Sequence, residues 1–358
     1  MKHLSEDSYE DPTVKSSEKQ TENTTNPSTK PSIKTSIKTT IRPIFKNQDG
    51  QVRWGYKLLT FAALWQVVFP VIILCTVLVL MLVLKSILTG MGMMDSGGNL
   101  PEVYWEPFQR WYMVVMMCLQ NLIMIFLSSA VWKWGFHSSW KKIGIFGSRY
   151  GVKWLAEIGK GILIGIVMIS LVVGGIWITG NASLTVGSTG FDPWLAGYFI
   201  MFIAVGFGEE ICYRGYAMAS MRTARPSWLI LVLPAILFGA AHGLNSNFSL
   251  LAFINICLVG VFLGLLFWYT DRIWIPIGFH IAWNYFQGPV YGFEVSGIDT
   301  PRIFIARIGE PNLLNGGGFG PEGGLFTTAV LVLAIGCVLY YYKGIKPKFM
   351  EAEESAQP

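Results

Sequence analysis

Residues 206–215 read GFGEEICYRG and lie inside the apolar run Trp194–Tyr216, which is long enough to cross a membrane as one helix. Each ionised side chain in such a helix costs about 2.5–3.5 kcal/mol on insertion scales before any pairing. The two acids and the arginine must therefore face a protein interior or a water-filled cavity. This stretch predicts a bundle of membrane helices around a polar interior.

The composition of the 358-residue chain fits that prediction. Hydrophobic residues make up 52% and charged residues 14%, and the mean hydropathy is +0.47, whereas soluble domains have about 25% charged residues. Residues 1–57 hold 10 of the 27 Lys and Arg, so the remainder is too apolar for water. The net charge of +5 lies mostly in the tail and short loops, where cations meet lipid headgroups. We expect the lipid bilayer, and no nucleic acid, as a partner.

A bilayer core takes about 20 apolar residues per helix, and eight stretches approach that length. They are Leu59–Leu84, Tyr112–Val131, Gly161–Ile178, Trp194–Tyr216, Trp228–His242, Phe248–Tyr269, Ile273–Tyr291 and Leu325–Tyr342. Cations concentrate in every second loop, as the positive-inside rule requires of cytoplasmic loops. The sequence therefore predicts an all-α polytopic membrane protein with about eight transmembrane helices and both termini cytoplasmic.

The chain divides into four parts. Residues 1–57 form a basic, Ser/Thr-rich cytoplasmic tail that ends in an interfacial strip; such a composition buries too little apolar surface to become ordered. Residues 58–193 carry helices one to three, and residues 194–291 carry helices four to seven with the polar groups. Residues 292–358 hold a Gly-rich outer loop, helix eight and a cytoplasmic C-terminal tail. The run Gly316–Gly318 predicts a flexible exterior loop.

The acids of the fourth helix differ in their expected partners. Glu210 and Arg214 are four residues apart, hence on one helical face, and can form an ion pair. Such a pair is as often structural as functional. Glu209 is rotated by about 100° and lacks that partner. Glu209 is therefore the candidate proton acceptor.

Two histidines lie in apolar stretches. His242 follows Phe238 by four residues, and Asn284 follows His280 by four, so each pair shares a helical face. A lone histidine on an apolar face is usually a hydrogen-bonded core residue. Two histidines, an asparagine and a Glu-Glu-Arg cluster in one membrane body favour a catalytic site instead.

Two chemistries could use these groups. In the first, Glu209 and His242 activate a water that attacks a carbonyl, while His280 and Asn284 donate hydrogen bonds to the oxyanion. In the second, His242, His280 and Glu209 bind a zinc ion, which lowers the pKa of its water to about 7. No HExxH helix is present and asparagine is an uncommon zinc ligand, so the sequence leans slightly to the first chemistry and leaves the second open.

Three ordered motifs carry a family resemblance. Glu209-Glu210-x-x-x-Arg214, Phe238-x-x-x-His242 and His280-x-x-x-Asn284 resemble those of the CPBP family, also called the Abi domain, which contains intramembrane CAAX-type proteases and bacteriocin-processing or immunity proteins. The resemblance covers Trp194 to Tyr291, about a quarter of the chain. The Phe-Arg-Gly often seen after the paired acids is replaced by Tyr213-Arg214-Gly215, which keeps the charges.

The resemblance implies a CPBP-type catalytic helical core and an intramembrane endopeptidase. Its substrate would be a membrane-associated or lipidated peptide or protein, processed in the CAAX or the bacteriocin manner. The implied roles are Glu209 as the base working with His242 on water, His280 and Asn284 at the oxyanion, and Glu210, Arg214 and Phe238 as supporting residues. Both metalloprotease and glutamate-protease accounts exist for the family, so zinc stays open.

Two rival functions also stay open. A non-enzymatic immunity or scaffold protein could bind peptides in an inherited cavity. A transporter could use the buried acids as proton or cation sites, although the two halves show no inverted repeat. On family grounds we expect a multi-pass protein of the bacterial cytoplasmic membrane, with the endoplasmic reticulum as second choice.

The predicted helices leave one conflict. At about 1.5 Å per residue, Glu209 falls in the cytoplasmic half of its helix and His242 towards the outer end of the next, roughly 10 Å or more apart in depth. That distance is too large for the two to share a water. We expect a kink at Pro234, or a deeper start of that helix, to bring them together.

Overall fold

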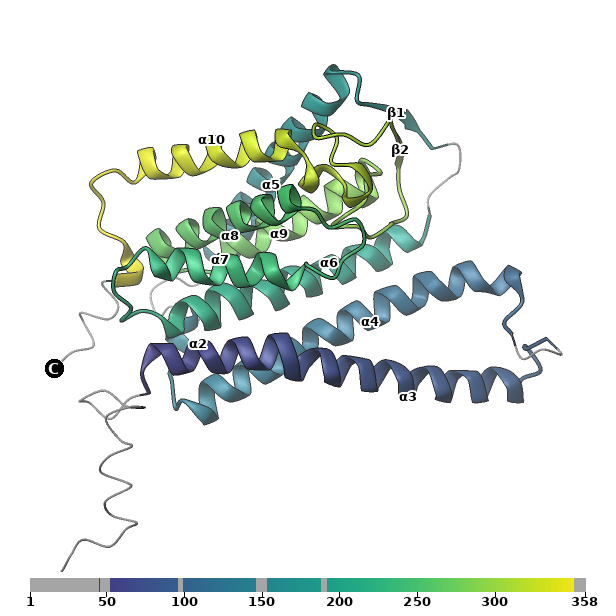
Figure 1. The fold of residues 1–358 in the computed structure, drawn as a ribbon, viewed down its shortest axis with the longest axis horizontal. Helices are drawn as coiled ribbons and strands as arrows, with labels where there is room; N and C mark the ends of the chain where they lie inside the picture. Colours follow the sequence, from purple (N-terminus) through teal and green to yellow (C-terminus); the bar gives the residue numbers. More distant parts are fainter. Residues whose placement is uncertain (1–44, 46–51, 96–98, 146–152, 188–191, 351–358) are drawn as a thin grey trace, which may run out of the picture. The chain divides into compact units, whose positions relative to one another are not determined.

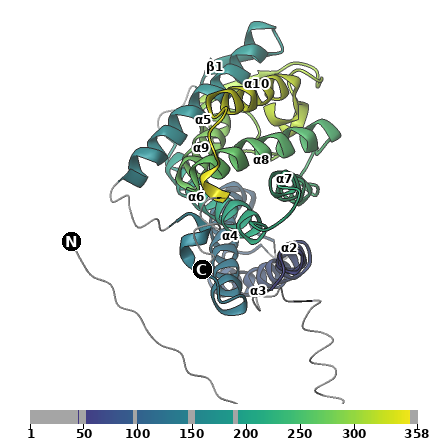
Figure 2. The ribbon, with the colours of Figure 1, turned by 90° about the vertical axis from the view of Figure 1, so that its left-hand side faces the viewer.

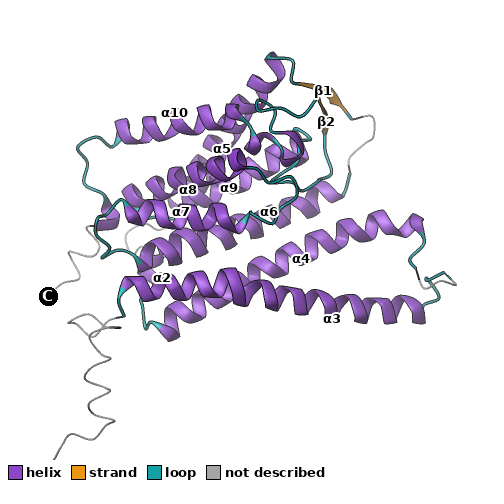
Figure 3. Cartoon of the chain, viewed as in Figure 1, coloured by secondary structure: helices purple, strands orange, loops and turns teal. Residues whose placement is uncertain are grey.

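The computed structural model describes Phe45 and residues 52–95, 99–145, 153–187 and 192–350. The expectation of a disordered tail therefore lies almost wholly outside the described residues. The described part is mostly helical (Figures 1 and 3). Its α-helices are α2 (Trp54–Ala63), α3 (Phe69–Gly90), α4 (Glu102–Ala130), α5 (Lys153–Ile178), α6 (Trp194–Glu210), α7 (Leu229–Ala241), α8 (Leu250–Thr270), α9 (Trp274–Tyr285) and α10 (Leu325–Tyr341).

Four of these helices continue directly into π-helical segments. The segments are Leu64–Val68 after α2, Val131–Gly135 after α4, Ile211–Met218 after α6 and Phe286–Val290 after α9. Short 3₁₀ turns cover Trp140–Ile143, Gly317–Phe319 and Pro321–Gly323. We call Ile211–Met218 the π segment, because it carries part of the candidate site.

Each of the eight predicted stretches contains a helix, but the helices differ in length. Five in the described residues are long and apolar enough to cross a membrane: Phe69–Gly90, Tyr104–Gly135, Lys153–Ile178, Trp194–Met218 and Leu250–Thr270. By contrast, α7, α9 and α10 have 13, 12 and 17 residues, and a full span takes about 20. The chain is a helical membrane protein, and a count of about eight spans is not established.

Glycines allow α9 to pack closely against α5. A Cβ atom added to Gly165 would lie 2.7 Å from the carbonyl oxygen of Phe279 on α9, and Gly161 and Gly278 likewise face backbone atoms of the opposite helix. Small residues four apart are the usual means by which membrane helices approach this closely. Figure 2 shows α9 next to both α5 and α6.

Glycines also fix α6 between two neighbours. A Cβ at Gly206 would lie 2.7 Å from the Ile281 side chain of α9, and one at Gly208 would overlap the side chain of Asn121 on α4. Consequently α6 lies between α4 and α9. The helix that carries the paired acids is therefore held directly against the helix that carries His280 and Asn284.

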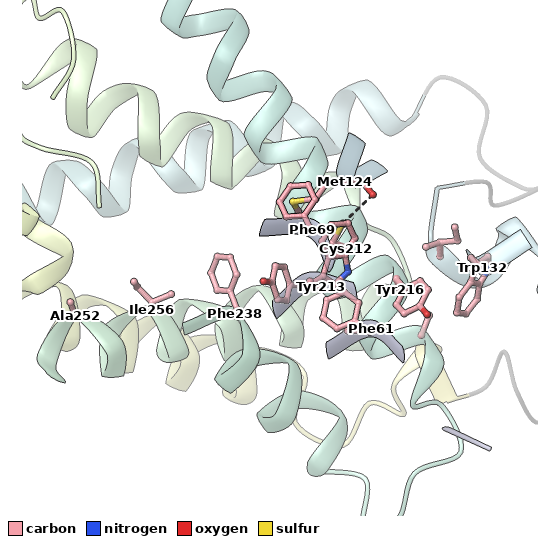
Figure 4. Close-up of a cluster of buried hydrophobic side chains, with 14 of the residues drawn as sticks. Phe61, Phe69, Met124, Trp132, Cys212, Tyr213, Tyr216, Phe238, Ala252 and Ile256 are labelled. Carbon is pink, nitrogen blue, oxygen red and sulfur yellow. Dashed lines mark hydrogen bonds between the residues drawn. The ribbon is translucent and has the colours of Figure 1, made fainter. Parts of the chain in front are cut away.

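An aromatic cluster attaches α2 to the π segment. The ring of Phe61, which is buried, lies 5.4 Å from that of Tyr213 and 5.3 Å from that of Tyr216, between centroids. Figure 4 shows these rings side by side, with Phe238 of α7 facing Tyr213. In α3, which is described throughout, Phe69 alone is buried. Exposed apolar side chains of α3, such as Leu74, Leu78 and Leu82, are available to lipid.

Two short strands depart from the all-α expectation. Strands β1 (Ala182–Val186) and β2 (Phe304–Ile308) pair antiparallel, with Ala182 opposite Ile308. Strand β2 belongs to residues 292–324, which we call the cap segment. Asn255 of α8 anchors this segment, because its Nδ2 donates to the carbonyls of Glu322 at 2.8 Å and Gly324 at 2.9 Å. The glycine-rich part is thus a structured element and not a free loop.

Candidate active site

The paired acids lie where α6 passes into the π segment. Glu209 and Glu210 end α6, and Arg214 lies one turn later in the π segment. Segments of this kind inside helices occur frequently at functional sites. Nη1 of Arg214 donates to Oε1 of Glu210 at 2.8 Å, and both side chains are buried, at 2% and 0% exposed. The ion pair expected from the spacing is therefore present.

Arg214 extends this pair to two further helices. Its Nη2 donates to the carbonyl of Gly260 on α8 at 3.0 Å. Its Cζ lies 5.0 Å from the ring centroid of Phe238 on α7, within the range of a cation–π contact. One buried guanidinium therefore joins the π segment to α7 and α8.

Glu210 also contacts α9. Nδ1 of His280 lies 2.9 Å from Oε1 of Glu210. A carboxylate oxygen accepts, so Nδ1 carries the proton and Nε2 is left to face the other acid. Nε2 lies 3.5 Å from Oε2 of Glu209. Glu210 thus orients the imidazole of His280 towards Glu209.

His242 follows the last residue of α7. Its Nδ1 lies 2.9 Å from the carbonyl oxygen of Phe238. Because a carbonyl can only accept, Nδ1 donates, and the neutral ring keeps a free lone pair on Nε2. This is the tautomer that a general base requires.

Phe238 lies at the centre of the three motifs. Its ring centroid lies 5.0 Å from that of His242, 6.2 Å from that of His280 and 4.9 Å from that of Tyr213. Arg214 covers the same ring, as described above. The end of α7 is thereby placed beside the π segment and α9, so the three motifs, which are far apart in sequence, meet around one aromatic ring.

These contacts bear on the expected separation in depth between Glu209 and His242. His242 and His280 both contact Phe238, and His280 in turn contacts Glu209. Helix α7 has 13 residues, with Pro234 inside it, and it ends at this level. His242 and Glu209 are thus linked through Phe238 and His280, and the short helix, which reaches only part of the way across a bilayer, favours a similar depth for both. The kink expected at Pro234 stays a prediction.

Asn284 lies one turn after His280 on α9, and both residues are buried. Helix α9 then continues as the π-helical residues Phe286–Val290. The backbone therefore places the amide of Asn284 and the imidazole of His280 on one helical face, as their spacing predicted.

The donor set expected for zinc does not assemble in the described residues. Within 45, 52–95, 99–145, 153–187 and 192–350, no three His, Cys, Asp or Glu side chains come close enough together to hold a metal ion. Nδ1 of His280 donates to Glu210 and Nδ1 of His242 donates to a backbone carbonyl, which leaves Nε2 of each ring as a lone-pair donor of the kind that metal-binding histidines use. The zinc hypothesis therefore stays a prediction.

Sequence reasoning missed Asn121 of α4. It is 1% exposed, its Nδ2 donates to the carbonyl of Met117 at 2.9 Å, and its side chain lies against Gly208, the residue before Glu209. Its Oδ1 is buried without a hydrogen-bond partner among the described residues. The signal was available, because an amide in the middle of an apolar span is costly unless it has a function or a partner.

The comparisons with known proteins agree with the motifs. Residues 191–286, about a quarter of the chain, match the family model described as type II CAAX prenyl endopeptidase Rce1-like. Searches of curated proteins and of solved structures gave no match. At a general level the family model implies a membrane protease. The resemblance inferred from the three motifs is confirmed, and residues 191–286 are similar in sequence to the Rce1-like type II CAAX prenyl endopeptidases.

Proposed function

We propose that this chain is an intramembrane endopeptidase of the CAAX type that hydrolyses a peptide bond in a membrane-associated or lipidated protein. The observation that carries the proposal is a linked set of contacts within the residues that match the family model: His242 and His280 both lie against Phe238, and Nε2 of His280 lies 3.5 Å from Oε2 of Glu209. We place the protein in a bacterial cytoplasmic membrane, with both termini cytoplasmic.

In the first step, Glu209 and His242 activate water. Oε2 of Glu209 is buried and has no hydrogen-bond partner among the described residues, so its lone pair is available to accept a proton. Nε2 of His242 offers a second acceptor, because Nδ1 donates to the backbone. The deprotonated water then attacks the scissile carbonyl carbon.

In the second step, His280 and Asn284 stabilise the oxyanion. The amide of Asn284 can donate one hydrogen bond. Nε2 of His280 can donate another when the ring is the doubly protonated imidazolium, because Nδ1 already donates to Glu210. The proton taken from water passes from Glu209 or His242 to the leaving amine, and the peptide bond breaks. Glu210 and Arg214 act on this step through His280, which they hold in place.

The proposal is tested by comparing protein termini in membranes that contain the native chain or Glu209→Gln. This substitution keeps the shape of the side chain and removes the carboxylate that accepts the proton. Termini present only with the native chain would support proteolysis and would identify the substrate. Glu102→Gln, a change of an exposed acid in the first turn of α4, is the matched control.

One outcome would contradict the proposal, and another would invalidate the assay. Identical termini for the native chain and Glu209→Gln, with equal amounts of folded protein, would exclude Glu209 as the base. Loss of the same termini with Glu102→Gln would show that the assay reports protein level and not chemistry.

A further inference from the structure

The cap segment, residues 292–324, contacts the turn that follows His242. Gly318 lies against Asn247, with 2.6 Å between an added Cβ and Nδ2 of Asn247, and this Nδ2 donates to the carbonyl of Gly318 at 3.2 Å. The rings of Phe248 and Phe319 meet edge to face at 5.8 Å, and Phe319 is fully buried. The whole cap segment lies outside the residues that match the family model, 191–286.

Glu322 fixes the part of the cap segment that reaches towards His242. Its Oε2 accepts from the backbone nitrogen of Ser296 at 2.8 Å and from the hydroxyl of Ser296 at 2.6 Å. Ser296 has φ of +49°, a backbone conformation that costs free energy for a residue with a side chain. The two hydrogen bonds to Glu322 offset that cost and hold the conformation.

A continuous chain of hydrogen bonds leads from Glu322 to His242. The carbonyl of Ser296 accepts from Nδ2 of Asn245 at 3.0 Å, and the backbone nitrogen of Asn245 donates to the carbonyl of His242 at 3.0 Å. Next to Ser296, Gly297 lies against the backbone of Ser246, so a side chain there would displace the turn. The cap segment therefore holds the turn after His242 in place, through a hydrogen bond and close backbone packing.

The cap segment also holds the end of α9. Gln287 lies three residues after Asn284, is fully buried, and donates from Nε2 to the carbonyl of Glu294 at 2.7 Å. The backbone of Glu322 is itself anchored to Asn255 of α8. One structured segment thus contacts both the turn after His242 and the segment after Asn284.

We propose that Glu322 is a positioning residue that, through Ser296 and Asn245, fixes the turn after His242 and thereby the placement of the His242 imidazole. The effect of Glu322 on turnover rests on the proposed function. The hydrogen bonds by which Glu322 fixes the turn do not depend on that function. Glu322 has no direct contact with the candidate catalytic side chains among the interactions described. A change at Glu322 should therefore alter the rate of the chemical step more than substrate binding.

Hydrogen–deuterium exchange of the full-length protein in detergent tests the hold on the turn without any need for activity. In Glu322→Ala, amides of residues 242–248 should exchange roughly tenfold faster, because two hydrogen bonds to a charged group are lost. Glu322→Gln should restore native exchange, since one amide oxygen can accept both bonds. Asn312→Ala is the control, because Asn312 joins the cap segment to Asn181 and not to this turn. Unchanged exchange in Glu322→Ala would overturn the proposal.

Turnover of a substrate identified by the terminus comparison tests the consequence. We expect kcat to fall by roughly 10- to 100-fold in Glu322→Ala, with KM changed less than about twofold, and to recover in Glu322→Gln. A loss of activity that Glu322→Gln does not restore would count against positioning by hydrogen bonds.

If Glu322→Ala does not fold, Asn245→Ala cuts the same chain of hydrogen bonds one step closer to His242 and should give both effects. If the native chain cleaves nothing, the proposed function fails and the exchange result still decides the hold on the turn.

Discussion

At the scale of single residues, Glu210 holds the candidate site together. One carboxylate oxygen accepts from Arg214 at 2.8 Å and from His280 at 2.9 Å, and the residue is fully buried. A buried ion pair adds little stability over an apolar pair of the same size, but breaking it leaves an unpaired charge. Glu210 is therefore better explained by the orientation of His280 than by stability alone.

This argument predicts a strong coupling between Glu210 and Arg214. Glu210→Ala and Arg214→Ala should each lower the free energy of unfolding by about 3–5 kcal/mol, because each leaves a buried charge without its partner. The double variant should be destabilised by clearly less than the sum of the two. Denaturant unfolding in detergent measures all three variants. Additive losses would show that the two side chains act independently.

Whether cleavage needs a metal ion also depends on individual side chains. If Glu209 and His242 activate water without a metal ion, a zinc chelator should leave cleavage unchanged. Glu209→Gln should abolish cleavage, because it removes the proton acceptor. Activity is measured on membranes dialysed against chelator, with and without zinc returned. Loss of cleavage on chelation that zinc restores would favour the metalloprotease account and replace the first step proposed above.

The spacing of residues predicted part of this geometry and missed part of it. Positions four apart on a helix gave the Glu210–Arg214 pair, since that contact is local. The contacts of His280 with both acids depend on how α6 and α9 pack, and no local pattern contains that information. Asn121 was overlooked because it lies in α4, outside the three motifs.

At the scale of elements, small residues decide how closely the helices approach. Helix α9 carries His280 and Asn284, and its position depends on Gly161 and Gly165 of α5. Apolar runs in the sequence predicted where helices form, because composition fixes that preference. The sequence did not predict the π-helical segments, nor the pairing of β1 with β2, whose partners lie more than a hundred residues apart.

Two glycines of α5 provide a matched comparison. Gly161→Ala should destabilise the protein by about 1–3 kcal/mol and reduce cleavage, because the new Cβ collides with the backbone of Ile275 and pushes α9 away. Gly159→Ala places its Cβ in open space, so it should be neutral or stabilising by up to about 1 kcal/mol through helix propensity. Thermal unfolding of both variants checks this. Equal effects at the two positions would exclude close packing of α5 and α9 as the cause.

At the scale of the whole described unit, the C-terminal segment packs onto α8 and the residues after the π segment through Phe349. Phe349 is fully buried, and its ring lies 5.1 Å from that of Trp268 and 3.8 Å from Cζ of Arg222. Arg222 also pairs with Asp271 and donates to the carbonyl of Lys142 at 2.8 Å. Burial raises the pKa of Asp271 above its usual value, although Arg222 opposes that shift. Sequence reasoning described residues 343–358 only as a tail, because nothing local indicates that Phe349 is buried.

Phe349 should therefore contribute substantially to stability. Phe349→Ala should lower the free energy of unfolding by about 3–5 kcal/mol, because it removes a fully buried ring and leaves a cavity beside Trp268 and Arg222. Tyr340→Ala, which changes an aromatic residue that is 82% exposed on α10, should have little effect. Denaturant unfolding in one detergent compares the two variants with the native chain.

A loss of similar size for both would mean that aromatic content, and not the docking of the C-terminal segment, sets the stability. No loss at Phe349 would mean that this segment is held by its other contacts, and that Arg222 serves mainly to join Asp271 to the loop at Lys142.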